Sequence, residues 1–318
     1  MSSTGHSLTD TETQPPAYDD VCVLLPTLNE AETIGGVIDE FHRQGFSNLL
    51  VIDGESTDDT RDIATEHGAR VLTQSGEGKG QAIREALDRI ETPYVLMADG
   101  DGTYRPEDAH AMVTPLRSGE ADHVIGDRFA SMAEGAMSRL NRTGNGQINR
   151  AFAYVHGRDL GDILSGYRAF TRDSAERMAL TEDGFGIETE LAVECARRNV
   201  PTAVVPIRYE PRPTESETNL RPFRDGGLII LTLYRLARTH NPLFYFGSVG
   251  VSTMCLGLLA AAWVGYRWLV YTTAHEVIAL FAASAFLFGM QLMVFGLLSD
   301  LIVTLHREQM RRIDDRER

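Results

Sequence analysis

The stretch YVLMADGDGTY, residues 94–104, decides how the rest of the chain is interpreted. A short apolar run that ends in two carboxylates separated by one glycine predicts a buried strand that presents Asp99 and Asp101 at the edge of a sheet. Mg²⁺ and Mn²⁺ prefer oxygen ligands and share one or two protein carboxylates with substrate phosphates, so the pair indicates a metal site and a diphosphate substrate. An isolated Asp-Gly-Asp is more often a polar turn after a strand. The rest of the chain therefore has to decide between these two interpretations.

Strand-like and helix-like segments alternate around this stretch. Apolar runs at residues 21–25, 48–52 and 70–73 predict strands, and segments with helical periodicity follow each of them. Such alternation with short connections predicts a mainly parallel sheet, in which ligands bind beyond the carboxyl ends of the strands. The polar residues expected to converge at those ends are Asp53, Lys79, Asp99 and Asp101.

Several classes of protein are excluded or disfavoured. The loop at residues 76–80 is not a P-loop, because Lys79 precedes a glycine, and it also lacks the Gly-x-Gly-x-x-Gly spacing. A balance of 45 acidic against 30 basic residues argues against a nucleic-acid binder. Lys79 is the only lysine, and an acidic surface poor in lysine is typical of cytoplasmic proteins from salt-loving organisms. The three cysteines lie far apart in apolar stretches, so we expect buried thiols without a disulfide or zinc site.

The second half of the soluble part is rich in arginine. Arg128 follows a predicted strand at residues 122–126, and a predicted helix at residues 137–156 carries Arg142 with two other arginines. Solvated arginines paired with local acids are the plain alternative to a phosphate site. The polar, proline-rich segment at residues 210–219 follows a predicted strand at residues 202–208, and we expect it to form a mobile lid.

The C-terminal part is expected to enter a membrane. Residues 243–266 and 277–305 are each apolar and long enough to span a bilayer, and a buried soluble hairpin is the alternative. Arginines flank the outer ends of both segments, so the positive-inside rule places the catalytic domain and both termini in the cytoplasm of a two-span cell-membrane protein. The expected organisation is a disordered acidic tail at 1–20, a catalytic domain at 21–223, an interfacial helix at 224–240, and a hairpin with a short cytoplasmic tail at 241–318.

Six motifs occur in an order that resembles family 2 glycosyltransferases, which have the Rossmann-like GT-A fold. They are PTLNE at 26–30, DGESTD at 53–58, GKG at 78–80, DGD at 99–101, GDRF at 126–129 and SGYR at 165–168. Within that family the chain is most similar to polyprenyl-phosphate sugar synthases, in particular haloarchaeal dolichyl-phosphate hexosyltransferases that begin surface-layer N-glycan assembly. The resemblance covers about residues 21–318. A Gln-x-x-Arg-Trp sequence is absent, which favours a single transfer over processive polymerisation.

The resemblance also implies roles for individual residues. Pro26, Asn29, Glu30 and Asp53 would surround the nucleoside of the donor, with Lys79 and Asp99 contacting the donor and Asp99 and Asp101 holding Mg²⁺ or Mn²⁺. Ser165, Arg128, Arg142 and Arg168 would bind the acceptor phosphate, and Arg128 would join Lys79, Asp99 and Asp101 in catalysis. Asn219 stands where the family has a lysine, so Arg212 or Arg221 is the expected substitute.

The function expected from these observations is an inverting transfer of one hexose, glucose from UDP-glucose, onto dolichyl phosphate. The alternatives are mannose from GDP-mannose, a glycan or lipid hydroxyl as acceptor, and a membrane scaffold with a degenerate fold. A hydroxyl acceptor would need a carboxylate base, whereas a lipid phosphate is mostly ionised near neutral pH because its second pKa is about 6. The expected partners are the nucleotide sugar, dolichyl phosphate and the bilayer, but no nucleic acid. The sequence is also compatible with a homo-oligomer.

Overall fold

A computed structural model describes residues 18–184, 186–212 and 242–317 of the chain. The chain divides into two compact units. The first contains residues 1–142, 160–188 and 200–219, and the second contains residues 143–159, 189–199 and 220–318. The predicted interfacial helix at 224–240, most of the predicted lid, and residues 1–17 of the predicted tail lie outside the described residues.

The first unit is built on one seven-stranded sheet with the order β3-β2-β1-β4-β6-β5-β7. Its pairs are parallel except those of β6, which runs antiparallel to both β4 and β5. The mainly parallel sheet expected from the sequence is therefore confirmed. The strands are β1 (Val21–Thr27), β2 (Asn48–Asp53), β3 (Arg70–Thr73), β4 (Tyr94–Met97), β5 (His123–Met132), β6 (Arg168–Thr171) and β7 (Thr202–Tyr209).

The strand register brings the motif loops to one edge. Thr27 at the end of β1 is aligned with Asp53 at the end of β2, and Leu24 is aligned with Met97 at the end of β4. The loops that follow these strands therefore leave the sheet side by side, and they carry Asn29, the 53–58 motif and Asp99. β5 extends beyond the predicted end at residue 126 and pairs with β7 again after an irregularity between Asp127 and Ser131.

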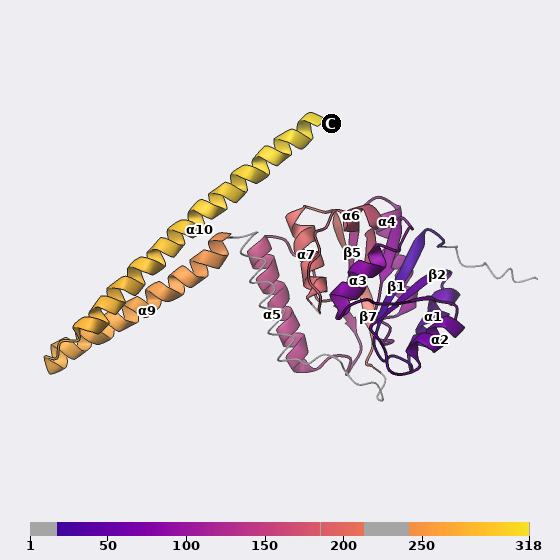
Figure 1. Ribbon diagram of the computed structural model, residues 1–318, viewed down its shortest axis with the longest axis horizontal. Helices are drawn as coiled ribbons and strands as arrows, with labels where there is room; N and C mark the ends of the chain where they lie inside the picture. Colours follow the sequence, from indigo (N-terminus) through magenta and orange to yellow (C-terminus); the bar gives the residue numbers. More distant parts are fainter. Residues whose placement is uncertain (1–17, 185, 213–241, 318) are drawn as a thin grey trace, which may run out of the picture. The chain divides into compact units, whose positions relative to one another are not determined.

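Helices cover both faces of the sheet. α1 (Ile34–Arg43) and α4 (Ala109–Arg117) pack with alternate residues of β1, such as Val21 and Val23, in one apolar core. α3 (Lys79–Leu87) contacts β1 and β2 and buries Ile83. The alternate β1 residues Cys22 and Leu24 are also buried, but they do not belong to the apolar core formed with α1 and α4. Figure 1 shows α1 and α2 (Thr60–Glu66) beside each other next to β1 and β2. Short elements complete this unit: η1 (Pro106–Asp108) before α4, and α6 (Arg172–Glu176) after β6.

The disordered tail was expected to include residues 1–20, but its last residues belong to the folded domain. Tyr18 is only 8% exposed, and its ring stacks on Phe46 with the centroids 4.5 Å apart. Its hydroxyl lies 2.9 Å from Nδ1 of His110 on α4. One aromatic ring supplies enough apolar area to anchor this segment although its neighbours are polar. Ordered structure thus begins at least as early as Tyr18.

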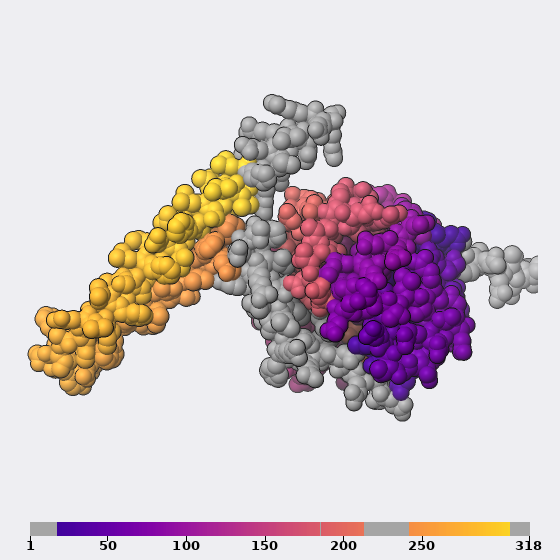
Figure 2. Space-filling view, viewed as in Figure 1, coloured from indigo at the N-terminus to yellow at the C-terminus, as the bar shows by residue number. Residues whose placement is uncertain are grey.

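Two long helices dominate the second unit, α9 (Pro242–Tyr271) and α10 (Glu276–Glu317). They run antiparallel, and Figure 2 shows the orange and yellow residues of the two helices against each other. A Cβ atom at Gly250 would lie 2.7 Å from the carbonyl oxygen of Gly289, and one at Gly257 would lie 2.8 Å from that of Ala282. Small residues therefore let the backbones approach closely, as in membrane helix pairs.

The segments Pro242–Tyr271 and Glu276–Leu305 are long and apolar enough to cross a membrane, in agreement with the two predicted spans. Two further helices, α5 (Arg139–His156) and α7 (Ile187–Arg197), begin in the first unit and continue into the second.

Candidate active site

The lone lysine lies between two carboxylates at the edge of the sheet. Lys79 is the first residue of α3, and its Nζ atom is 2.5 Å from Oδ1 of Asp99 and 2.6 Å from Oε1 of Glu188. Burial alone would lower the pKa of the ammonium group, but these two carboxylates raise it above its usual range. Lys79 therefore stays charged, and the structure brings it together with Asp99 as the sequence predicted.

Asp101 pairs with an arginine from a distant segment. The guanidinium of Arg212, three residues beyond the end of β7, has NH2 at 2.5 Å from Oδ2 of Asp101 and at 3.8 Å from Oε1 of Glu30. The other oxygen of Asp101 accepts hydrogen bonds from the amide and hydroxyl of Thr103, at 3.0 and 2.6 Å. A backbone bond from Glu210 to Thr103 holds the two segments together. Each carboxylate of the Asp-Gly-Asp motif thus has its own cation.

The site holds more negative than positive groups. Asp99, Asp101, Glu30 and Glu188 lie around Lys79 and Arg212, and Oε2 of Glu30 is buried without a hydrogen-bond partner among the described residues. Burial raises the pKa of Glu30 to about 7; Arg212 lowers it, and the charges of Asp101 and Asp99 add to the rise. A raised pKa beside two aspartates, with one carboxyl oxygen of Glu30 lacking a hydrogen-bond partner among the described residues, indicates that this cluster would accept further positive charge.

A divalent ion fits this arrangement only with ligands from the substrate. Among the described residues, no group of three His, Cys, Asp or Glu side chains is placed to hold a metal ion. Asp99 and Asp101 alone match the pattern in which Mg²⁺ binds one or two carboxylates plus substrate phosphates. Bound in that way, the ion would neutralise charge on a departing diphosphate.

The first two motifs are joined by hydrogen bonds. Asn29 has a positive φ of 56°, and its Oδ1 accepts from the amide of Thr57 at 2.9 Å. The backbone amide of Asn29 donates to Oγ of Ser56 at 2.9 Å. Asp53 is fully buried and accepts from the amide and hydroxyl of Ser56. Asp53 therefore fixes the loop that was expected to surround a nucleoside, and its own oxygens face the interior. Pro26 lies at the end of β1, partly buried.

The two glycines beside Lys79 allow the loop at residues 182–183 to pack directly against the start of α3. A Cβ atom at Gly80 would lie 2.1 Å from the carbonyl oxygen of Glu182, and one at Gly78 would lie 2.3 Å from that of Asp183. The amides of Gly80 and Gln81 both donate to the Asp183 carbonyl, at 2.8 and 3.2 Å. These N-terminal amides of α3 are thus already satisfied, and Lys79 is the one cation of the loop at residues 76–80.

The SGYR motif acts through its backbone. A Cβ atom at Gly166 would lie 2.8 Å from Oδ2 of Asp99, so glycine lets this backbone reach the site. Arg168 and Ser165 were expected to bind the acceptor phosphate, but both are 0% exposed. The Arg168 guanidinium donates to the carbonyls of Ser165 and Ile163, at 3.0 and 2.6 Å. Both side chains are therefore buried and hold the loop in this structure, and their expected contact with the acceptor phosphate stays a prediction.

Arg128 is also paired inside the protein. Its Nε and NH2 atoms lie 2.5 and 2.9 Å from the two oxygens of Asp162, and its Cζ lies 5.3 Å from the ring centroid of Tyr209. Burial would lower the pKa of this guanidinium, but Asp162 raises it well above its usual range. Arg142, near the start of α5, has an exposed side chain and is the accessible member of the expected acceptor set.

Sequence reasoning assigned no role to Glu188 or Asp162. Glu188 lies at the start of α7 and Asp162 lies in the loop before β6, but their partners, Lys79 and Arg128, are far away along the chain. Arg212 was only an expected substitute for the missing lysine, and the structure places it directly on Asp101.

A mainly parallel sheet with an Asp-Gly-Asp motif beyond β4 defines the GT-A class of nucleotide-sugar transferases. Residues 22–178 match the model of the glycosyl transferase family 2. Glycosyltransferase AglJ of Haloferax volcanii is 61% identical over 303 residues, covering 95% of this chain and 100% of that protein. A dolichyl-phosphate hexose transferase of the same organism is 36% identical, covering 67% of this chain and 91% of that protein. The chain belongs to the family 2 glycosyltransferases.

A solved structure agrees with this assignment. Glucosyl-3-phosphoglycerate synthase of Mycobacterium tuberculosis, in complex with Mn²⁺ and UDP-glucose, is 25% identical with a TM-score of 0.57. The match covers 68% of this chain and 78% of the mycobacterial chain.

Proposed function

We propose that this glycosyltransferase moves one hexose, glucose from UDP-glucose, onto dolichyl phosphate with inversion at the anomeric carbon. The observation that carries this proposal is the coexistence of two features in one chain. One is a site in which Lys79 and Arg212 hold the Asp-Gly-Asp carboxylates, and the other is a pair of helices long enough to cross a bilayer. The similarity to a dolichyl-phosphate hexose transferase supports the acceptor, and the UDP-glucose complex of the mycobacterial structure supports the donor.

The donor diphosphate would lie beside Lys79, Arg212 and the two aspartates. Asp99 and Asp101 would hold the metal ion, which would neutralise the diphosphate, and Arg212 would then be free to turn its guanidinium to the phosphates, where bidentate contacts orient as well as neutralise them. Lys79 remains fixed by Glu188 and supplies a compact positive charge. Preorganised charge of this kind stabilises the leaving group without further reorganisation.

The acceptor needs little activation. An oxygen of the lipid phosphate attacks the anomeric carbon as the carbon–oxygen bond to the donor diphosphate breaks, and the bonding electrons leave with UDP. Since the phosphate is already mostly ionised near neutral pH, positioning carries most of the rate. We assign acceptor binding to the exposed Arg142, whereas Arg128 supports the site through Asp162. The hairpin would hold the site near the headgroup, with the catalytic domain in the cytoplasm, for the first step of lipid-linked N-glycan assembly.

The test uses membranes that contain the full chain. They are incubated with dolichyl phosphate and UDP-glucose, GDP-mannose or other nucleotide sugars, and the lipid product is identified by mass. Asp101→Asn is the matched inactive control and should insert into the membrane normally. We expect the transfer of one hexose from UDP-glucose to dolichyl phosphate. No product should form when a chelator removes the metal ion. Unchanged transfer in chelator would overturn the proposal that the site depends on a metal ion. A mannosylated lipid formed from GDP-mannose would show that the donor is GDP-mannose and not UDP-glucose.

A hydroxyl acceptor is the second candidate, and Glu30 is the observation that favours it. Its unpaired carboxyl oxygen and a pKa of about 7 are the properties of a general base. In that case Glu30→Gln should abolish transfer with the donor still bound. With a phosphate acceptor, the same variant should keep most of its turnover.

A further inference from the structure

A polar side chain interrupts the apolar part of α10 near its centre. Gln291 lies about midway along Glu276–Leu305, and its side chain is exposed on the helix surface. Within the described residues, no hydrogen bond involves the Gln291 amide. In a bilayer that surface would face hydrocarbon, where an amide without a partner is costly.

A second polar residue lies on the same face. Ser284 precedes Gln291 by seven residues and is also exposed, and its hydroxyl forms no hydrogen bond among the described residues. The hydroxyls of α9 behave differently: Ser252 donates to the carbonyl of Ser248, and Thr253 donates to that of Val249, each at 2.8 Å. The hydroxyls of Ser252 and Thr253 are therefore satisfied within α9, whereas the side chains of Ser284 and Gln291 have no such partner within the described part of α10.

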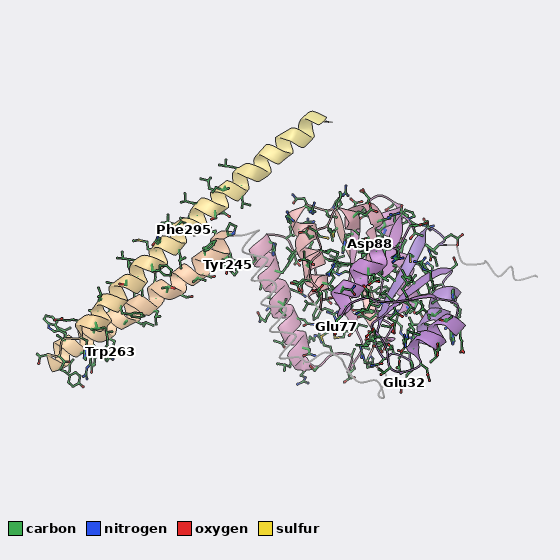
Figure 3. All side chains as sticks on the ribbon, viewed as in Figure 1. Glu32, Glu77, Asp88, Tyr245, Trp263 and Phe295 are labelled. Carbon is green, nitrogen blue, oxygen red and sulfur yellow. The ribbon has the colours of Figure 1, made fainter. Side chains whose placement is uncertain are left out.

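The Ser284–Gln291 line points away from α9. The residues of α10 that pack on α9 include Ala282, Ala285, Gly289 and Gly296, which are buried. At 100° per residue, Gln291 is about 200° around the helix from Gly289. Its neighbours on that face, Phe288 and Phe295, are 56% and 51% exposed, and Phe295 is labelled on α10 in Figure 3. The outer face of α10 thus combines large apolar side chains with one unpaired amide.

We propose that this outer face of α10 binds the same face of a second copy of the chain, with Gln291 opposite Gln291. A carboxamide is both donor and acceptor, so two copies related by a two-fold axis satisfy each other, as an isologous interface requires. A lipid or polyprenyl chain offers no donor and cannot do this. Interhelical bonds of this kind, with packed aromatic and aliphatic side chains, stabilise helix pairs in membranes.

This inference rests on the part of the proposed function that places α9 and α10 in the membrane. The experiment uses full-length protein labelled with donor and acceptor fluorophores and reconstituted at decreasing protein-to-lipid ratios. Energy transfer should fall with dilution along a dimer isotherm. Gln291→Leu should weaken association by about 3- to 10-fold, and Gln291→Asn should retain most of it. Thr253→Val is the matched control and should change nothing, because that hydroxyl is satisfied within α9.

Cysteine cross-linking tests the geometry. In a Cys255→Ser background that keeps Gln291, Ser284→Cys should form a disulfide-linked dimer on mild oxidation, and Leu258→Cys, at an exposed position of α9, should not. Equal cross-linking at both positions, or association unaffected by Gln291→Leu, would overturn the interface. Extraction of the protein from vesicles by alkaline carbonate would instead overturn the membrane part of the proposed function. Loss of transferase activity alone would leave the association measurement standing.

Discussion

Arg212 acts as a built-in cation for Asp101. Because its guanidinium lies 2.5 Å from Oδ2 of Asp101, any metal ion at that oxygen has to displace it. Arg212→Ala should therefore bind Mn²⁺ more tightly in the absence of donor, by up to about tenfold, although transfer slows. Electron paramagnetic resonance of Mn²⁺ measures the affinity directly. Arg105→Ala is the control, since Arg105 is exposed and pairs with Glu210 at 3.3 Å. Equal Mn²⁺ affinity in wild type and Arg212→Ala would show that the ion pair does not compete with the metal.

The space around Lys79 is restricted by the residues that surround its side chain. Its ammonium fits between Asp99 and Glu188 where Gly78 and Gly80 already contact the 182–183 backbone. A planar guanidinium is larger and donates in a fixed fork, so Lys79→Arg should lower kcat/KM for the donor by at least about tenfold. Steady-state kinetics with varied UDP-glucose measures this. Donor kinetics like those of the wild type would show that the loop has room for either cation.

His110 links the N-terminal segment to α4 and gives it a pH dependence. Burial lowers the pKa of His110, whose ring lies 2.9 Å from the Tyr18 hydroxyl and 3.0 Å from Oε1 of Gln44. A depressed pKa means that the imidazole contributes stability above its unfolded value near 6.5, and this contribution is lost as the pH falls through the folded value. His110→Gln should therefore lose less thermal stability than wild type between pH 7.5 and 5.5. An equal fall in melting temperature for the two proteins between these pH values would contradict this prediction.

At the scale of elements, the close contact between α3 and the 182–183 loop depends on Gly80. An added Cβ atom would lie 2.1 Å from a backbone oxygen, which cannot move as a flexible side chain does. Gly80→Ala should destabilise the protein by about 1–3 kcal/mol and reduce donor use, because Glu188 follows that loop. Gly36→Ala in α1 is the control: apart from the backbone of α1 itself, no atom lies within 4 Å of the added Cβ atom, so helix propensity predicts a gain of about 0.5–1 kcal/mol. Chemical denaturation compares them, and equal effects would contradict the steric account.

For the whole molecule, the proposed topology puts the short connection between α9 and α10 on the outside of the cell. Thr273 lies in that connection and is exposed, whereas Ser118 is exposed at the end of α4. A membrane-impermeant maleimide should label Thr273→Cys in intact cells and Ser118→Cys only after permeabilisation. The two variants serve as controls for each other in a Cys255→Ser background. Labelling of Ser118→Cys in intact cells would reverse the orientation.

The sequence by itself determined the alternation of strands and helices, the mainly parallel sheet and the two long apolar helices, because each follows from local periodicity and length. It also predicted that Lys79 and Asp99 meet, because the carboxyl ends of parallel strands share one edge of a sheet.

Only the tertiary structure decided which carboxylates and cations pair. Arg212 and Asp101 are 111 residues apart, and Arg128 on β5 is 34 residues from Asp162, so no local periodicity predicts that they meet. The same holds for burial: Arg168 and Ser165 belong to a polar motif, but the packing of β6 and its preceding loop takes both out of solvent. Charge pairing and burial depend on which loops meet in space, and that is set by the packing of the sheet, not by the local sequence.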